Sequence, residues 1–142
     1  MAGAATTEEH PARAAARRSM EAVHRKDKQA RLDNFAADAV VEDPVGPSGF
    51  DSEGRGHRGR DAIAAFWERW IAPNRVLFAV RESYAGGDEV ANVGSITTVL
   101  PSGAAMVVQG VFTYRVDAEG KVVALRAFWE PARLQPIAAP AT

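Results

Sequence analysis

Four runs in the second half of the chain decide the fold: VLFAVRESY at 76–84, VANVGSITTVL at 90–100, AMVVQGVFTYRV at 105–116 and VVALRAFW at 122–129. Apolar and polar residues tend to alternate along these runs, and this period of two is typical of half-buried β-strands. The segments between the runs are rich in residues that favour tight turns: GGD at 86–88, PSG at 101–103 and DAEG at 117–120. The second half of the chain therefore predicts an antiparallel meander.

The first half has helical periodicity instead. Three helices are predicted. The first has apolar residues at 12, 15, 16, 20 and 23, and the second spans about 28–36 with Leu32, Phe35 and Ala36 facing inward. The third carries an apolar stripe of Ile63, Phe66, Trp67, Trp70 and Ile71. Pro73 ends the third helix. Helices followed by strands predict an α+β fold, in which three N-terminal helices pack on a curved, mainly antiparallel sheet and enclose a cone-shaped hydrophobic pocket.

Composition limits the classes of protein that fit. The 142 residues are 46% hydrophobic and 25% charged, which predicts a single domain over 1–142 with an ordered core at about 12–131 and flexible tails at about 1–8 and 133–142. A net charge of -1 argues against a nucleic-acid partner or an anionic membrane. No apolar run reaches membrane-spanning length and no signal-peptide core is present, so a cytoplasmic protein is expected.

One carboxylate occupies a distinctive position. Asp43 lies in VVEDPVG at 40–46, where an apolar run ends and Pro44 restricts the backbone before it. Such an aspartate is able to act as a proton-transfer base at the mouth of an apolar pocket, although Asp-Pro is also a common way to begin a turn. The loop from Pro44 to Gly59 is long enough to form a rim or lid.

Signals for metals and cofactors are weak. His10, His24 and His57 lack the spacing of a metal site, and the chain has no cysteine. The glycines of GRGHRG at 54–59 have dinucleotide-motif spacing, but no convincing strand precedes them. We therefore expect no metal, and the dinucleotide-motif match carries little weight.

Three segments together resemble ketosteroid isomerase and its relatives in the NTF2-like (SnoaL-like) superfamily: DAVVEDPVG at 38–46, GRDAIAAFW at 59–67, and VFTYRV at 111–116 continuing to Trp129. The similarity extends over about residues 12–131 and is greatest to the actinobacterial isomerase-like branch. It implies a cone-like α+β fold, a hydrophobic pocket, a homodimer packed through the sheet, and no cofactor.

The resemblance also implies roles for individual residues. Asp43 matches the family's catalytic base and Trp129 its pocket tryptophan, whereas Ser19 and Phe112 replace the two groups that normally stabilise the oxyanion. Ser19 and Tyr114 are the candidate replacement donors, and Gln109 has the opposite strand parity. The predicted pocket is formed by Phe35, Phe66, Trp67, Met106, Val108, Phe112 and Trp129, with Trp67 replacing a supporting tyrosine.

Three functions fit this pattern. The first is a ketosteroid-isomerase-like enzyme that shifts a double bond in a steroid or similar lipophilic ketone, weakened because each missing oxyanion donor typically costs about 10²–10³ in rate. The second is a non-catalytic binding protein for a steroid-like or other hydrophobic small molecule. The third is another enzyme of the fold, a polyketide cyclase or an epoxide hydrolase, for which Asn92 and Arg126 are available polar residues. In an apolar pocket, desolvation is expected to raise the pKa of Asp43.

Overall fold

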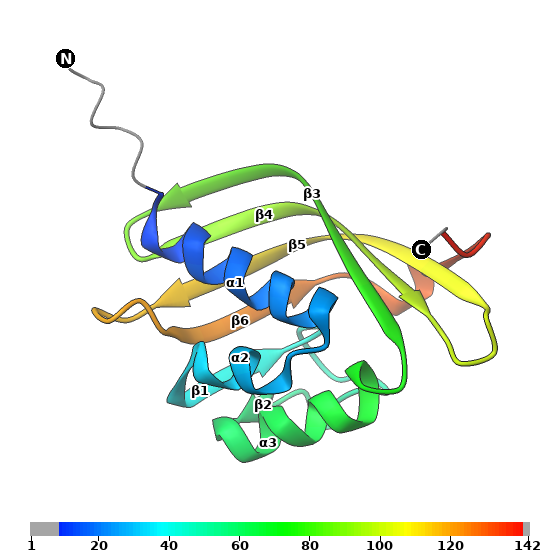
Figure 1. Cartoon of the computed structure of the whole chain (residues 1–142), viewed down its shortest axis with the longest axis horizontal. Coiled ribbons are helices and arrows are strands. Elements are labelled where there is room, and N and C mark those ends of the chain that lie inside the picture. The colour runs from blue at the N-terminus through cyan, green and yellow to red at the C-terminus, as the bar shows by residue number, and fades with distance from the viewer. Residues whose placement is uncertain (1–8, 141–142) are drawn as a thin grey trace.

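The computed structural model describes residues 9–140, so the tail predicted at 1–8 lies outside the described residues. The chain forms these elements in order (Figure 1): α1 Pro11–Arg25, α2 Lys28–Asp33, β1 Phe35–Glu42, β2 His57–Arg58, α3 Gly59–Phe66, a π-helical turn Trp67–Ile71, β3 Arg75–Gly86, β4 Glu89–Val99, β5 Ala105–Val116, β6 Val122–Phe128, a 3₁₀ turn Pro131–Arg133 and β7 Gln135–Ile137.

The strands form one mixed, mostly antiparallel sheet in the order β2-β1-β6-β5-β4-β3, with β7 paired to β5. β1 and β6 are parallel and every other pair is antiparallel. Strands β3 to β6 coincide with the four alternating runs to within one or two residues at each end. The predicted α+β class and the antiparallel meander are therefore confirmed.

Helix α1 lies across one face of the sheet (Figure 1). Its inward face carries Ala12, Ala15 and Ala16, all fully buried, and small side chains allow a helix backbone to approach the sheet closely. The core continues through Phe35 and Val41 of β1 and Ile63 of α3, so it joins helices α1 and α3 to the first strand. Among the described residues, no helix combines the length and apolar character needed to cross a bilayer.

The long strands bend at a bulge. The register of β3 against β4 shifts between Val80 and Glu82, and Gly94 of β4 pairs with Val80 just before the shift. A Cβ atom at Gly94 would overlap the carbonyl oxygen of Ala79, so glycine permits the close approach of the two backbones there. Bulges bend a strand and increase its twist, and this one contributes to the curvature of the sheet.

The end of the second helix differs from its prediction. The helix was expected to continue to Ala36, but α2 stops at Asp33 and Phe35 begins β1. Long-range contacts override the local pattern, because the Asn34 side chain donates to the Ala15 carbonyl and the Asn34 carbonyl accepts from Val122 of β6. Phe35 and Ala36 are consequently strand residues.

Several further elements were not predicted, including β2 at the end of the predicted loop and the 3₁₀ turn. The helical stripe that begins in α3 continues past Phe66 as a π-helical turn, in which the Ala72 amide donates to the Trp67 carbonyl. In the predicted C-terminal tail, residues 135–137 form β7 against the start of β5, although Pro136 interrupts their donor pattern. A proline is tolerated there because β7 has no strand on its other side.

Candidate functional site

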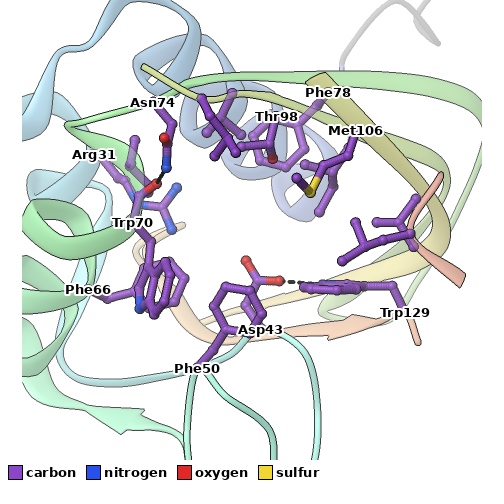
Figure 2. Close-up of a pocket in the computed structure, with 16 residues that line it drawn as sticks. Arg31, Asp43, Phe50, Phe66, Trp70, Asn74, Phe78, Thr98, Met106 and Trp129 are labelled. Atoms are coloured by element: carbon purple, nitrogen blue, oxygen red, sulfur yellow. Dashed lines mark hydrogen bonds between the residues drawn. The ribbon is translucent and has the colours of Figure 1, made fainter. Parts of the chain in front are cut away.

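A cavity of about 280 Å³ lies between the sheet, the π-helical turn and the loop that follows β1 (Figure 2). Its wall is mainly apolar, with four polar side chains among sixteen residues: Arg31, Asp43, Phe50, Phe66, Trp70, Ile71, Asn74, Val76, Phe78, Ile96, Thr98, Leu100, Met106, Val108, Trp129 and Leu134. Ligand pockets of proteins typically combine such apolar walls with a few polar groups.

Asp43 is positioned by the parallel pairing of two strands. Glu42, the last residue of β1, pairs with Arg126 of β6, so the carboxyl ends of both strands lie at the same edge of the sheet. Asp43 and Trp129 follow these two strand ends, and the Trp129 Nε1–H donates to Asp43 Oδ1 at 2.7 Å. The Asp43 carboxylate points into the cavity (Figure 2). This geometry orients the carboxylate with one oxygen bound and the other directed at the cavity.

Burial raises the pKa of Asp43 above its ordinary value. The hydrogen bond from Trp129 and the electrostatic influence of Arg31 and His57 act in the opposite direction, but desolvation is the largest effect. The predicted direction is confirmed. A carboxylate with a raised proton affinity is a stronger base than an exposed one, as proton abstraction from carbon requires.

Of the four polar residues that line the cavity, the sequence analysis identified only Asp43 and missed Arg31, Asn74 and Thr98. Arg31 is the charged one among the three that were missed. Its side chain is only 3% exposed, although it lies on a short helix whose inward residues were expected to be Leu32, Phe35 and Ala36. The guanidinium carbon lies 5.5 Å from the centre of the Phe35 ring. Arg31 is one of 17 basic residues, and nothing in its local sequence separates it from the exposed ones.

Phe50 brings the loop after β1 into the cavity wall. Its ring centre lies 4.5 Å from that of Trp70 and 5.5 Å from that of Trp129. The loop is tied by Asp51, whose carboxylate accepts from the amides of Gly54 and Gly56. A single aromatic residue in a loop of Gly, Ser and Pro was the available sequence signal for this role.

The predicted pocket residues fall into two sets. Phe66, Met106, Val108 and Trp129 line the cavity. The other three are buried outside its lining: Phe35, Trp67 and Phe112. Phe112 packs in the layer behind the wall, with its ring edge toward Phe78 at 6.4 Å, and Phe78 takes the position facing the cavity.

The candidate oxyanion donors lie behind the same wall. Tyr114 is 2% exposed, and burial raises its pKa to about 12, so the phenol is protonated at neutral pH. Ser19 is fully buried near Tyr114, yet its hydroxyl has no hydrogen-bond partner of acceptable geometry among the described residues. Neither residue belongs to the lining. Tyr114 is close enough to Asp43 and Arg31 for their charges to affect its pKa, but it does not line the cavity.

Three other polar residues considered from the sequence lie away from Asp43. Gln109 is exposed and accepts from Arg81, as its strand parity predicted. Arg126 is also exposed and forms an ion pair with Glu42 at 2.9 Å, whereas Asn92 is buried outside the cavity lining. Within residues 9–140, no group of three or more His, Cys, Asp or Glu side chains is arranged to hold a metal ion.

Replacing Trp129 with phenylalanine is expected to raise the pKa of Asp43. The indole N–H stabilises the ionised carboxylate, so removing it favours the protonated acid and moves the titration to higher pH. Titration of the Asp43 carboxyl carbon by NMR measures this change. Trp70→Phe, which alters the same cavity without removing a donor to Asp43, is the matched control; a Trp129→Phe titration no higher than that of the control would contradict the assigned role.

Comparison with known proteins identifies the family. A model of the SnoaL-like domain matches residues 16–132, whereas no curated protein sequence gives a significant match. Rv0760c from Mycobacterium tuberculosis is 31% identical with a TM-score of 0.89, over 93% of this chain and 100% of that one. The structure of Rv0760c in complex with estradiol-17β-hemisuccinate is 32% identical with a TM-score of 0.86, over 89% of this chain and 99% of that one.

A second solved relative, the Δ5-3-ketosteroid isomerase from Mycobacterium sp., is 34% identical with a TM-score of 0.87, over 91% of this chain and 100% of that one. The family model covers most of the chain, and the two solved relatives share the fold of this protein over nearly their whole length. The chain therefore belongs to the SnoaL-like domain family of the NTF2-like superfamily.

Proposed function

We propose that this protein is a ketosteroid-isomerase-like enzyme that shifts a carbon–carbon double bond in a steroid or similar lipophilic ketone. The observation that carries the proposal is the Asp43 carboxylate, which has a raised pKa and is held by Trp129 at the wall of an apolar cavity. The 34% identity to a mycobacterial ketosteroid isomerase supports the reaction class. The complex of Rv0760c with estradiol-17β-hemisuccinate supports a steroid-like ligand.

The proposed reaction is an intramolecular proton transfer. Asp43 removes a proton from the carbon between the ketone and the β,γ double bond, and the C–H electron pair moves toward the carbonyl to leave a dienolate. The protonated Asp43 then returns the proton two carbons further along, which forms the conjugated ketone and restores the carboxylate. Trp129 keeps one Asp43 oxygen fixed throughout, so the other oxygen serves both positions.

Absorbance of the conjugated product tests this activity directly. The protein is mixed with 5-androstene-3,17-dione, and the rate is compared with an equal concentration of an unrelated protein. We expect a rate above that blank. A rate equal to the blank would contradict isomerase activity toward this substrate.

A non-catalytic binding protein is the second candidate. The resemblance places Ser19 and Phe112 at the two positions that normally stabilise the oxyanion, and the observation in favour of this candidate is that neither residue lines the cavity. That the hydroxyls of Ser19 and Tyr114 donate hydrogen bonds to a ligand oxygen stays a prediction. Titration with a fluorescent steroid separates the cases: saturable binding without turnover favours the binding protein, and no saturable binding contradicts both functions.

We also propose a homodimer that packs through the outer face of the sheet. Val111 of β5 and Phe128 of β6 are a cross-strand pair, and they are exposed by 36% and 42%. Adjacent exposed apolar side chains on a sheet are a common feature of subunit interfaces. Sedimentation velocity is expected to give the mass of two chains, and a monomer at micromolar concentration would contradict the proposal. A cytoplasmic location stays a prediction, to be checked by cell fractionation.

A further inference from the structure

Arg31 is a buried cation without a direct partner. Its side chain is 3% exposed, and its Nε has no hydrogen-bond partner among residues 9–140. Asp43 and Tyr114 affect the pKa of Arg31 through electrostatic interactions, but no ion pair within 4.0 Å joins Arg31 to Asp43. Taking a guanidinium out of water is strongly unfavourable unless hydrogen bonds and an opposite charge compensate it. The protein alone does not supply that compensation in full.

The position of Arg31 relates this deficit to the cavity. Arg31 and Asp43 both line it, and their charges interact across its interior (Figure 2). The wall near Arg31 carries the aromatic side chains of Phe66 and Trp70 together with the neutral amide of Asn74 (Figure 2). Tyr114 and Ser19, the donors predicted from the sequence, are outside the lining. Arg31 is thus the cation that a ligand oxygen is able to reach.

We propose that the Arg31 guanidinium binds the oxygen on which negative charge develops when Asp43 removes a proton, so that the cavity selects lipophilic ketones that form an enolate. This inference rests on the proposed isomerase function and assigns the electrophilic group that the Ser19 and Phe112 positions lack. It makes Arg31 a catalytic residue, because the guanidinium contacts the reacting oxygen.

Charge balance favours a ketone over a ligand that is already an anion. With Asp43 ionised and Arg31 protonated, the pair is neutral, and a neutral ketone leaves it so. Proton transfer neutralises Asp43 and places the negative charge on the ligand oxygen, so one cation compensates the charge before and after the step. A carboxylate ligand would add an excess negative charge to an apolar cavity, which is unfavourable.

Binding of 2-naphthol tests the inference without requiring turnover. This phenol stands in for the enolate, and its ionisation state in the complex is read from its fluorescence. Asp43→Asn imitates the protonated base that accompanies the enolate, so the key comparison is between Asp43→Asn and Asp43→Asn/Arg31→Met. We expect the pKa of bound 2-naphthol to be about 1–3 units lower when Arg31 is present, because an adjacent cation stabilises the phenolate by that amount.

The variants separate local binding from general effects of charge. Arg31→Lys is expected to recover part of the lowering, since it keeps the charge and loses the planar fork. Arg25→Met removes an exposed positive charge from α1 and is expected to leave the bound pKa unchanged. Equal pKa values of bound 2-naphthol with and without Arg31 would overturn the role of Arg31 and leave the proposed function intact. No saturable binding by any variant would overturn both.

Thermal unfolding excludes a merely structural role. Methionine fills a similar volume without a buried charge, so Arg31→Met is expected to unfold at the same or a higher temperature than the unsubstituted protein. In the isomerase assay the same variant is expected to lose about 10²–10³-fold in rate, as removal of an oxyanion donor does. A lower unfolding temperature with an unchanged rate would instead assign Arg31 to the core.

Discussion

Asp43→Asn is expected to lower the rate of 5-androstene-3,17-dione isomerisation by about 10²–10⁴-fold, the usual contribution of a positioned general base. The asparagine amide fits the same space and still accepts the hydrogen bond from Trp129, but it has no basic oxygen with which to remove a proton. Initial rates from the absorbance of the conjugated product, measured at saturating substrate, give the loss.

Glu42→Gln is the matched control for this change. Glu42 is the carboxylate next to Asp43 in the chain, but it forms an ion pair with Arg126 and does not line the cavity. We expect its rate to stay within about twofold, since the Glu42 charge is already paired with Arg126 and lies outside the cavity lining. An Asp43→Asn variant as active as Glu42→Gln would contradict the assignment of the base.

The stability of Asp43→Asn shows whether it is still folded. Because the pKa of Asp43 is higher in the folded state than in the unfolded chain, the folded protein binds more protons between these two values. The stability therefore falls as pH rises through this window, and above it the raised pKa of Asp43 makes the fold less stable than it is at low pH. Asp43→Asn removes this effect, so its unfolding temperature at pH 7 is expected to equal or exceed that of the unsubstituted protein.

Phe35→Ala is expected to reduce the free energy of unfolding by about 3–5 kcal/mol, the usual range for a buried phenylalanine. Phe35 is fully buried at the start of β1, where it pairs with Val122 of β6. Its carbonyl accepts from Nε and Nη2 of Arg60 at 3.2 and 2.6 Å, and its ring lies against the Arg31 guanidinium. The truncation leaves a void where α2, β1 and α3 meet.

Urea denaturation measures the loss, with Tyr84→Ala as the control. Tyr84 is 61% exposed on β3, so truncation of its side chain to alanine is expected to reduce the free energy of unfolding by less than about 1 kcal/mol. A loss for Phe35→Ala no larger than that for Tyr84→Ala would show that this part of the core is not packed as described.

Strands β3 to β6 were predictable because each carries its own evidence, whereas β1, β2 and β7 were not predicted as strands. Alternation over 8 to 12 residues with turn residues between the runs determines β3 to β6, and their observed ends differ from the predicted ones by at most two residues. The apolar stripe from Ile63 to Ile71 likewise predicted a helix, and only its π-helical end was not foreseen.

The remaining features depend on contacts between distant residues. The backbone carbonyl of Asn34 accepts from Val122, 88 positions away, so no local pattern places the end of α2 before Phe35. Asp43 was identified as the candidate base from its turn and from the family resemblance, and Trp129 as a pocket residue, but the hydrogen bond between them was not predicted. Arg31 reads as a solvated helix residue, because its burial follows from how α2 packs rather than from its neighbours in sequence.

The residues of the cavity wall come from two kinds of segment: the ends of paired strands and a loop outside the sheet. Asp43 and Trp129 stand at the ends of paired strands, whose register is fixed by the sheet, whereas Phe50 belongs to a loop outside the sheet. Loops tolerate substitution and changes of length far better than paired strands do. Mutations around Phe50 are thus able to reshape the cavity while Asp43 and Trp129 stay in place. The fold permits the range of ligands to evolve, or to be engineered, separately from the chemistry.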